Sequence, residues 1–240
     1  MRASVYTDRA LEGQAGRFVW LSIDTEDAAN DAFLTRYPVS VWPTLLVVEP
    51  RTGAIALRYA GGATVPQLLK LLDDGERAAR GQGDKADAAI ARGDGLANQG
   101  DAAAAAAAYE EAIAAAGPRW PRLGRAAEAL TFALSQARQH ERCARRALEL
   151  FPRVAGTYSA ANVALNGVFC ARDLPAAHTG RPALLQSLES AARQTLEDPA
   201  IPFSADDRSG LFDALVAARE GLKDEPGARA PGPGVQRHEG

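Results

Sequence analysis

A proline followed at once by an apolar run constrains the fold of this chain more than any other feature. Residues 37–59 read YPVSVWPTLLVVEPRTGAIALRY, and Pro43 stands just before the apolar residues 45–48. Proline has no N–H to donate to a β-ladder, so it is tolerated as the first residue of a strand. A turn with proline and glycine at 49–53 precedes a second predicted strand at 54–59. The stretch therefore predicts a β-hairpin that begins at Pro43.

The Trp42–Pro43 peptide bond has two interpretations. Cis bonds make up only about 5–6% of X-Pro bonds in folded proteins, so an ordinary trans proline ahead of a core strand is the simpler one. A cis bond would instead mark a tight turn with a specific role. The spacing alone does not choose between them.

The order of the predicted elements in residues 1–80 resembles the second half of a thioredoxin-like domain. These elements are a strand at 18–24, a helix at 27–36, the proline loop, the hairpin, the glycine pair 61–62 and a helix at 65–80. The resemblance implies a cis Pro43, a Trp42 whose backbone contacts an extended peptide, and a strand that starts at Thr44. Trp42, Pro43 and Thr44 are therefore the predicted substrate-binding residues.

The redox cysteines of the thioredoxin family are missing. No CxxC occurs, and the two cysteines, Cys143 and Cys170, lie outside the resemblance. Residues 1–11 look like the body of the helix that carries CxxC in that family, so the central strand before it is missing too. Buried unpaired strand groups cost about 1–3 kcal/mol each. We therefore expect the first domain to rearrange, recruit a strand or fray, or Met1 to be an internal methionine with CxxC encoded upstream. We favour the last of these hypotheses.

Alanine-rich helical sequence replaces strand-like sequence near residue 83, where we place a domain boundary. Residues 86–117 predict an αα-hairpin. Gly100 suits the end of the first helix, Asp101 suits the N-cap of the second, and Tyr109 is a large side chain for the small residues opposite. The hairpin resembles a tetratricopeptide repeat.

Further helices are predicted after this hairpin. They lie at 123–135, 138–151, 156–171, 181–197 and 203–220. The first two resemble a second, degenerate tetratricopeptide repeat, and the others would cap the array. The predicted fold class is α/β plus all-α. Its domains are an incomplete thioredoxin-like domain at 1–82, a tetratricopeptide-like helical solenoid at 83–222 and a disordered, Pro- and Gly-rich tail at 223–240.

The two cysteines have a simple and a reactive interpretation. Cys143 is either a small packed hydrophobe in its helix or a thiol activated by nearby arginines. Cysteines 27 residues apart predict neither a disulfide framework nor a zinc site.

Carboxylates near the predicted strand ends are candidate acid–base groups. Asp24, Glu26 and Asp27 follow the first predicted strand, and Glu49 follows the next one. Solvated loop charge is the simpler interpretation of all four.

Composition narrows the class of partner. The net charge of −3 over 240 residues is too small to indicate a nucleic-acid or acidic-membrane partner. No apolar run approaches the ~20 residues that span a bilayer. No GxGxxG, P-loop or nucleophile-elbow motif occurs, and no cofactor or metal is predicted. The expected partners are protein or peptide clients.

The resemblance implies a role in thiol redox balance or protein folding, with the chain as given redox-inert because CxxC is missing. We expect an extended peptide to bind near Pro43 and in the groove of the helical array. One alternative is a thiol–disulfide oxidoreductase whose active-site segment lies upstream, and another is a purely structural scaffold. The expected location is the cytoplasm, or the periplasm if an upstream signal peptide has been lost.

Overall fold

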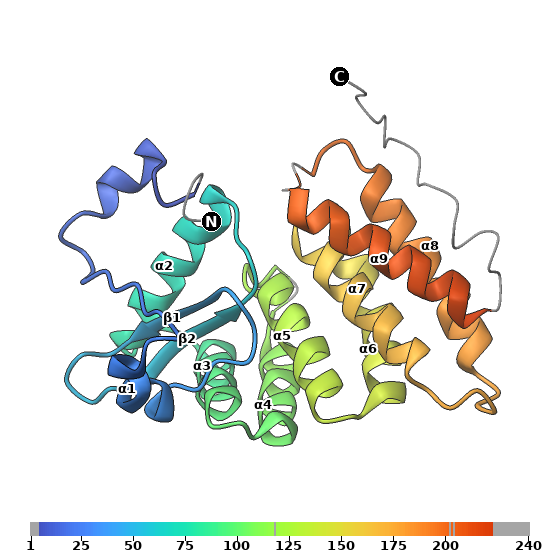
Figure 1. The fold of residues 1–240 in the computed structure, drawn as a ribbon, viewed down its shortest axis with the longest axis horizontal. Helices are drawn as coiled ribbons and strands as arrows, with labels where there is room; N and C mark the ends of the chain where they lie inside the picture. Colours follow the sequence, from blue (N-terminus) through green and yellow to red (C-terminus); the bar gives the residue numbers. More distant parts are fainter. Residues whose placement is uncertain (1–4, 118, 202, 204, 223–240) are drawn as a thin grey trace. The chain divides into compact units, whose positions relative to one another are not determined.

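The computed structural model describes residues 5–117, 119–201, 203 and 205–222. The chain divides into two compact units, Met1–Trp120 (unit 1) and Pro121–Gly240 (unit 2). Unit 1 contains a small antiparallel sheet with helices, and the described elements of unit 2 are all helices (Figure 1). The fold is therefore a mixed α/β part followed by a helical part, as predicted at this coarse level. The predicted disordered tail lies outside the described residues.

Short 3₁₀ and α turns precede the sheet. They are η1 (Arg9–Gln14), η2 (Ala28–Asn30) and α1 (Asp31–Arg36). The helix predicted at 27–36 forms only as η2 and α1. The prediction of an α-helix in residues 1–11 is wrong for residues 5–11, which form a turn followed by the start of η1.

The strand predicted at 18–24 is also wrong, because this segment forms no ladder. No strand of the described residues pairs with it, and a segment without a ladder partner gains no strand hydrogen bonds. The side chains of Val19 and Leu21 are 88% and 73% exposed, so the apolar run there is not buried as a core strand would be.

The predicted hairpin is present as β1 (Thr44–Val48) and β2 (Ile55–Ala60), which pair antiparallel. The Glu49 N–H donates to the Ala54 carbonyl at 2.9 Å, and Gly53 takes a φ of 69°, which glycine adopts readily. The Gly61 N–H donates to the Pro43 carbonyl at 2.8 Å. Pairing therefore extends from the turn back to Pro43.

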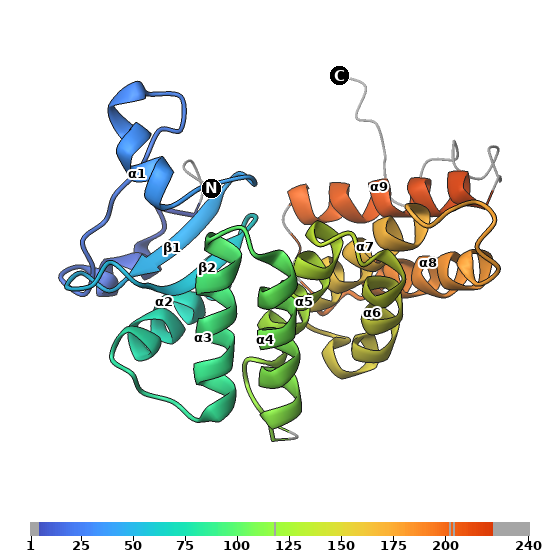
Figure 2. The same ribbon diagram turned by 90° about the horizontal axis from the view of Figure 1, so that it is seen from below.

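Helix α2 (Val65–Ala79) supplies the other half of the core of the sheet (Figure 2). Thr64 and Gln67 form a capping box at its N-terminus. The buried leucines of this core are Leu57, Leu68, Leu71 and Leu72. A Cβ at Gly75 would lie 2.6 Å from Cγ2 of Val47, so glycine is what allows α2 to approach β1 so closely.

The predicted αα-hairpin is formed by α3 (Lys85–Asn98) and α4 (Ala102–Ala115). Gly100 has a φ of 81°, and the Asp101 side chain caps α4 by accepting a backbone hydrogen bond at 3.0 Å. A Cβ at Gly93 would lie 2.5 Å from Cε1 of Tyr109. The large aromatic side chain therefore fills the space that glycine leaves on the facing helix, as the sequence predicted.

Helix α3 packs along β2 and belongs to unit 1 (Figure 2). The units therefore divide at Trp120, later than the boundary expected at residue 82. The indole Nε1 of Trp120 donates to Asp87 of α3 at 2.9 Å, which ties the end of unit 1 back to it. The amino-acid composition changes after the last strand, so it placed the domain boundary there. The compact unit extends further along the chain, because α3 packs against the edge of the sheet.

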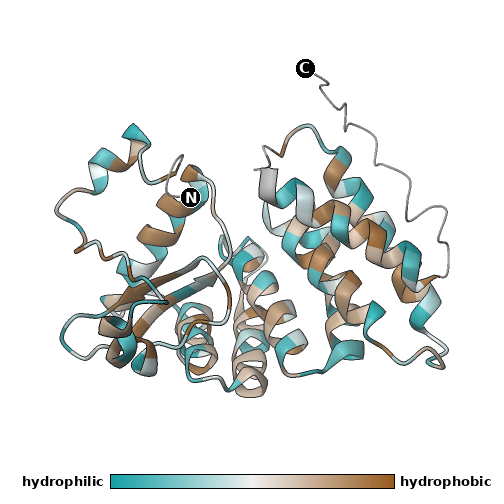
Figure 3. Cartoon of the chain, in the orientation of Figure 1, coloured by the Kyte–Doolittle hydropathy of each residue, from teal (hydrophilic) through white to brown (hydrophobic). Residues whose placement is uncertain are grey.

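Unit 2 is built around α7. Its helices are α5 (Leu123–Gln136), α6 (His140–Val154), α7 (Ser159–Arg172), α8 (Arg181–Glu197) and α9 (Ala205–Gly221). Helix α7 contacts the other four, and its inward residues are small or apolar (Figure 3). A Cβ at Gly167 would lie 2.6 Å from Cβ of Ala147, which shows how closely α7 and α6 approach. Helix α6 runs through Pro152 to Val154, beyond its predicted end at residue 151.

Candidate functional site

The predicted substrate-binding residues lie at the start of β1. The Trp42–Pro43 peptide bond is cis. The Trp42 residue is 64% exposed, and its indole Nε1 donates a hydrogen bond to Thr25 Oγ1 at 3.0 Å. Thr44 Oγ1 donates to the Val41 carbonyl at 2.6 Å and closes the loop around Pro43. The loop presents a large aromatic surface beside the first residues of a strand.

Alternate residues of β1 direct their backbone groups to opposite edges of the strand. In an antiparallel ladder, hydrogen-bonded residue pairs alternate with non-bonded pairs. The Pro43 carbonyl bonds toward β2, so the backbone groups of Leu45 also face β2. The N–H and C=O groups of Thr44 and Leu46 then point to the other edge.

The outer edge of β2 is closed by a side chain of α3. Arg58 lies opposite Leu46 in a non-bonded pair, so its N–H points away from β1 and donates to Asp94 Oδ2 at 3.1 Å. Asp94 is fully buried, and its Oδ1 accepts a second hydrogen bond from the Tyr109 hydroxyl at 2.9 Å. A buried carboxylate therefore satisfies a group that would otherwise pair with another strand.

The outer edge of β1 carries no strand, because the sheet of the described residues has the order β1-β2. Most of the exposed large apolar side chains of the described chain lie ahead of this edge in sequence. They are Tyr6, Val19, Trp20, Leu21 and Trp42. An unpaired edge with its backbone groups available is a template for a further strand.

The candidate acid–base residues act as local caps. Asp24 and Asp27 each accept a hydrogen bond from the backbone N–H two residues further on, at 3.0 and 2.9 Å. Glu49 accepts from the Thr52 hydroxyl and N–H at 2.7 Å each, and from Arg51 Nε at 3.0 Å. Hydrogen bonds from Thr52 first, and then from Arg51, lower the pKa of Glu49 to about 2. These contacts favour the solvated-loop interpretation.

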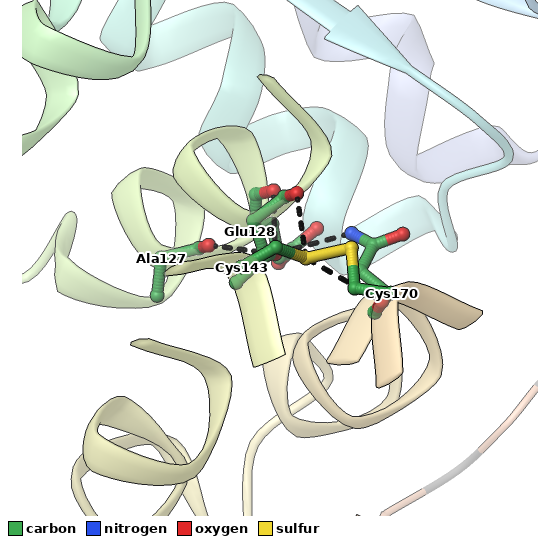
Figure 4. Close-up of a disulfide and its surroundings, with 6 residues drawn as sticks. Ala127, Glu128, Cys143 and Cys170 are labelled. Atoms are coloured by element: carbon green, nitrogen blue, oxygen red, sulfur yellow. Dashed lines mark hydrogen bonds between the residues drawn. A yellow bond between two sulfur atoms is a disulfide. The ribbon is translucent and has the colours of Figure 1, made fainter. Parts of the chain in front are cut away.

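The two cysteines form a disulfide that joins α6 to α7 (Figure 4). The expectation that the two cysteines form no disulfide is therefore wrong, and so is the activated thiol at Cys143, whereas the predicted packing of Cys143 inside its helix layer is confirmed. Both cysteines are fully buried, with their Cα atoms 6.0 Å apart. A signal was present in the sequence: Cys143 precedes Gly156 by 13 residues, and Cys170 follows Thr157 by 13. Positions equidistant from the turn of an antiparallel helix pair lie opposite each other.

Polar backbone and side-chain groups surround the disulfide. Asn166 Nδ2 donates to Thr131 Oγ1 at 3.1 Å. The carbonyl oxygens of Thr131 and Asn166 lie 3.4 and 3.6 Å from Cys143 Sγ. A disulfide sulfur carries no hydrogen, so these are close contacts, whereas a reduced thiol would donate to one of them. The described chain contains no free cysteine, so it offers no thiol for disulfide exchange.

Comparisons with family models, curated proteins and solved structures give no match for this chain. In the part of the chain that the structure describes, no group of three or more His, Cys, Asp or Glu side chains is placed to hold a metal ion. Across the same residues, every helix is too short or too polar to cross a bilayer. The function is therefore inferred from the geometry of the β1 edge.

Proposed function

We propose that unit 1 binds extended segments of client proteins by adding them as a strand to the free edge of β1, beside Trp42. The observation that carries this proposal is the difference between the two edges of the sheet. Asp94 closes the β2 edge, whereas the backbone groups of Thr44 and Leu46 on β1 are left facing outward. Strand addition of this kind takes its affinity from main-chain hydrogen bonds and its specificity from alternate side chains.

The proposal includes a thioredoxin-like origin for residues 1–82 and a tetratricopeptide-like origin for the helices from α3 onward. The cis bond before Pro43, the hairpin with Gly61-Gly62 and α2 after it, and the Gly93–Tyr109 contact support it. The role is to hold unfolded or extended clients in protein folding or thiol redox balance, without thiol chemistry by the described residues. The pairing and burial of Cys143 and Cys170 support the last point.

The disulfide also favours one kind of cellular compartment for this protein. Disulfides persist in oxidising compartments and are rare in the cytosol, where thiols are kept reduced. We therefore propose an oxidising compartment, such as the periplasm, in place of the cytoplasm expected from the sequence. Mass spectrometry tests this on protein that is purified without reductant from its natural source and then alkylated while unfolded in denaturant. The Cys143–Cys170 pair should stay unalkylated, and full alkylation of both cysteines would reject the proposal.

A peptide with blocked backbone groups tests strand addition. The probe is an alternating Thr-Val peptide, and the control is the same peptide N-methylated at every second amide, on the side that would pair with β1. Calorimetric titration of the full chain should show binding of the first and none of the second, because the side chains are unchanged and only the ladder donors are lost. Equal binding of both peptides would reject strand addition.

Two proline variants of β1 test strand addition by changing the protein instead of the peptide. Leu46→Pro removes an N–H that faces the free edge, so the hairpin should form and peptide binding should be lost. Leu45→Pro removes an N–H that faces β2, so it should destabilise the hairpin itself. Circular dichroism separates the two effects. A folded Leu46→Pro chain that binds the peptide as well as the wild type would contradict the proposal.

A further inference from the structure

The segment ahead of the free edge, together with β1, carries a net negative charge. Residues 18–48 contain four acidic side chains and one basic one, so their net charge of −3 equals that of all 240 residues. The acidic side chains, which we call the acidic loop, are Asp24, Glu26, Asp27 and Asp31. All four residues are exposed. A positively charged group near the start of β1 would therefore meet a local excess of negative charge.

The negative charges of the acidic loop are not neutralised by Lys, Arg or His side chains of the described residues. None of its four carboxylates forms an ion pair with another described residue. The one basic residue of the segment, Arg36, donates from Nη2 to the Thr52 carbonyl at 3.0 Å and lies over the ring of Tyr37 at 5.3 Å. The four negative charges are therefore available to a partner.

The acidic loop is held beside the start of β1. Thr25, which lies between Asp24 and Glu26, accepts the hydrogen bond from the Trp42 indole at 3.0 Å. Asn30 Nδ2 donates to the Asp24 carbonyl oxygen at 2.9 Å and fixes the other end of the loop. Asp24 and Glu26 thus flank the point where Trp42, itself two residues ahead of β1, is anchored.

We infer that the β1 edge selects an extended peptide that carries a basic side chain, Arg or Lys, at the end that passes Trp42. This inference rests on the proposed strand addition. The apolar side chains and backbone of the peptide would pair along β1, and its cation would lie between the acidic loop and the exposed face of the Trp42 indole. Both surroundings favour a cation, since aromatic faces and carboxylates each attract positive charge.

Charge-matched peptides test the inference. The probes are the alternating Thr-Val peptide with Arg at its first position, the same peptide with Arg at its last position, and each with neutral citrulline in place of Arg. One Arg position should raise the affinity for the full chain by about tenfold at low ionic strength, as several screened ion pairs together would. The gain should shrink as salt is added, because exposed charges are screened.

A protein variant locates the effect. The combined change Asp24→Asn, Glu26→Gln, Asp27→Asn and Asp31→Asn removes the charges but keeps the side-chain oxygens that cap the loop. The matched control neutralises the same number of exposed carboxylates in unit 2: Glu141→Gln, Glu149→Gln, Asp173→Asn and Glu197→Gln. The loop variant should bind Arg and citrulline peptides equally, and the control should discriminate between them like the wild type.

The outcomes separate this inference from the proposed function. If the Arg and citrulline peptides bind the wild type equally, charge selection is wrong while strand addition stands. If the Arg preference survives in the loop variant, the acidic loop is not its source, and the inference is wrong. If no peptide binds, including the neutral one, the proposed function fails and the inference falls with it.

Discussion

The backbone N–H of Arg58 in β2 donates to the carboxylate of Asp94 in α3 at 3.1 Å, so a helix side chain ends the sheet. The same carboxylate accepts from Tyr109 of α4 at 2.9 Å, which links the αα-hairpin to the strand. One fully buried residue therefore joins the elements of unit 1 that composition assigns to separate domains.

Removing the Asp94 carboxylate should destabilise unit 1. Asp94→Ala leaves the Arg58 N–H and the Tyr109 hydroxyl buried without this acceptor, at about 1–3 kcal/mol for each. Tyr109→Phe removes one donor and should cost about 1 kcal/mol. Urea unfolding followed by circular dichroism gives these values, with Glu12→Gln as a control at an exposed position. An Asp94→Ala chain as stable as the control would show that this carboxylate does not hold the edge.

Two glycines of α3 should respond in opposite ways to the same substitution. Gly93→Ala places a Cβ 2.5 Å from Tyr109 Cε1, and such overpacking costs about 1–3 kcal/mol. Gly95→Ala meets nothing within 4 Å, and alanine in a helix interior is favoured over glycine by about 0.5–1 kcal/mol. Thermal unfolding should therefore show a lower Tm for Gly93→Ala and a higher one for Gly95→Ala. The same sign for both would contradict the packing of α3 on α4.

Reducing the disulfide should weaken unit 2. The bond closes a loop across a sequence separation of 27 residues, for which the chain-entropy model gives about 3–4 kcal/mol. Unfolding of the wild type with and without reductant, compared with the double variant Cys143→Ala and Cys170→Ala, measures this loss. The double variant should be insensitive to reductant. If wild type and double variant unfold at the same denaturant concentration without reductant, the bond contributes nothing.

Glu49 should titrate far below an ordinary glutamate. Its pKa is lowered to about 2 by hydrogen bonds, first from Thr52 and then from Arg51, against an ordinary value of 4.5. Because the folded-state pKa is the lower one, the turn has its full stabilisation above about pH 4.5 and loses it as the pH falls toward 2. Carboxyl NMR shifts give the midpoint.

Thr52→Val removes the hydroxyl donor to Glu49 and should raise that midpoint toward the ordinary range. Thr35→Val is the matched control, since its hydroxyl donates to the Asp31 carbonyl elsewhere in unit 1. A wild-type midpoint near 4.5, or no change in Thr52→Val, would show that the turn hydrogen bonds do not form.

The sequence predicted the hairpin and most helices because their signals are local. Pro43, Gly53 and Gly100 each fix one backbone conformation, and helix periodicity needs no knowledge of distant residues. The pairing of Tyr109 with Gly93 was also within reach, because both lie on one αα-hairpin. For the candidate site, the thioredoxin-like resemblance implied Trp42, Pro43 and Thr44 as peptide-binding residues, and they lie together at the start of β1.

Features that depend on distant neighbours could not be predicted in this way. Residues 18–24 have strand-like composition, but a strand also needs a ladder partner, which composition does not report. Asp94 resembles any helix aspartate in the sequence, and only the placement of α3 along β2 gives it a buried role. The Cys143–Cys170 bond was missed because it joins two helices, although their equal distances from the turn at Gly156 pointed to it.

The disulfide also sets what limited proteolysis would release. Cys143 and Cys170 lie on either side of the connection between α6 and α7, where Gly156 takes a φ of 75°. A single cut in that connection would break the polypeptide but leave both products joined through sulfur. Such a nicked chain would migrate as one species in electrophoresis until a reducing agent is added, and then as two.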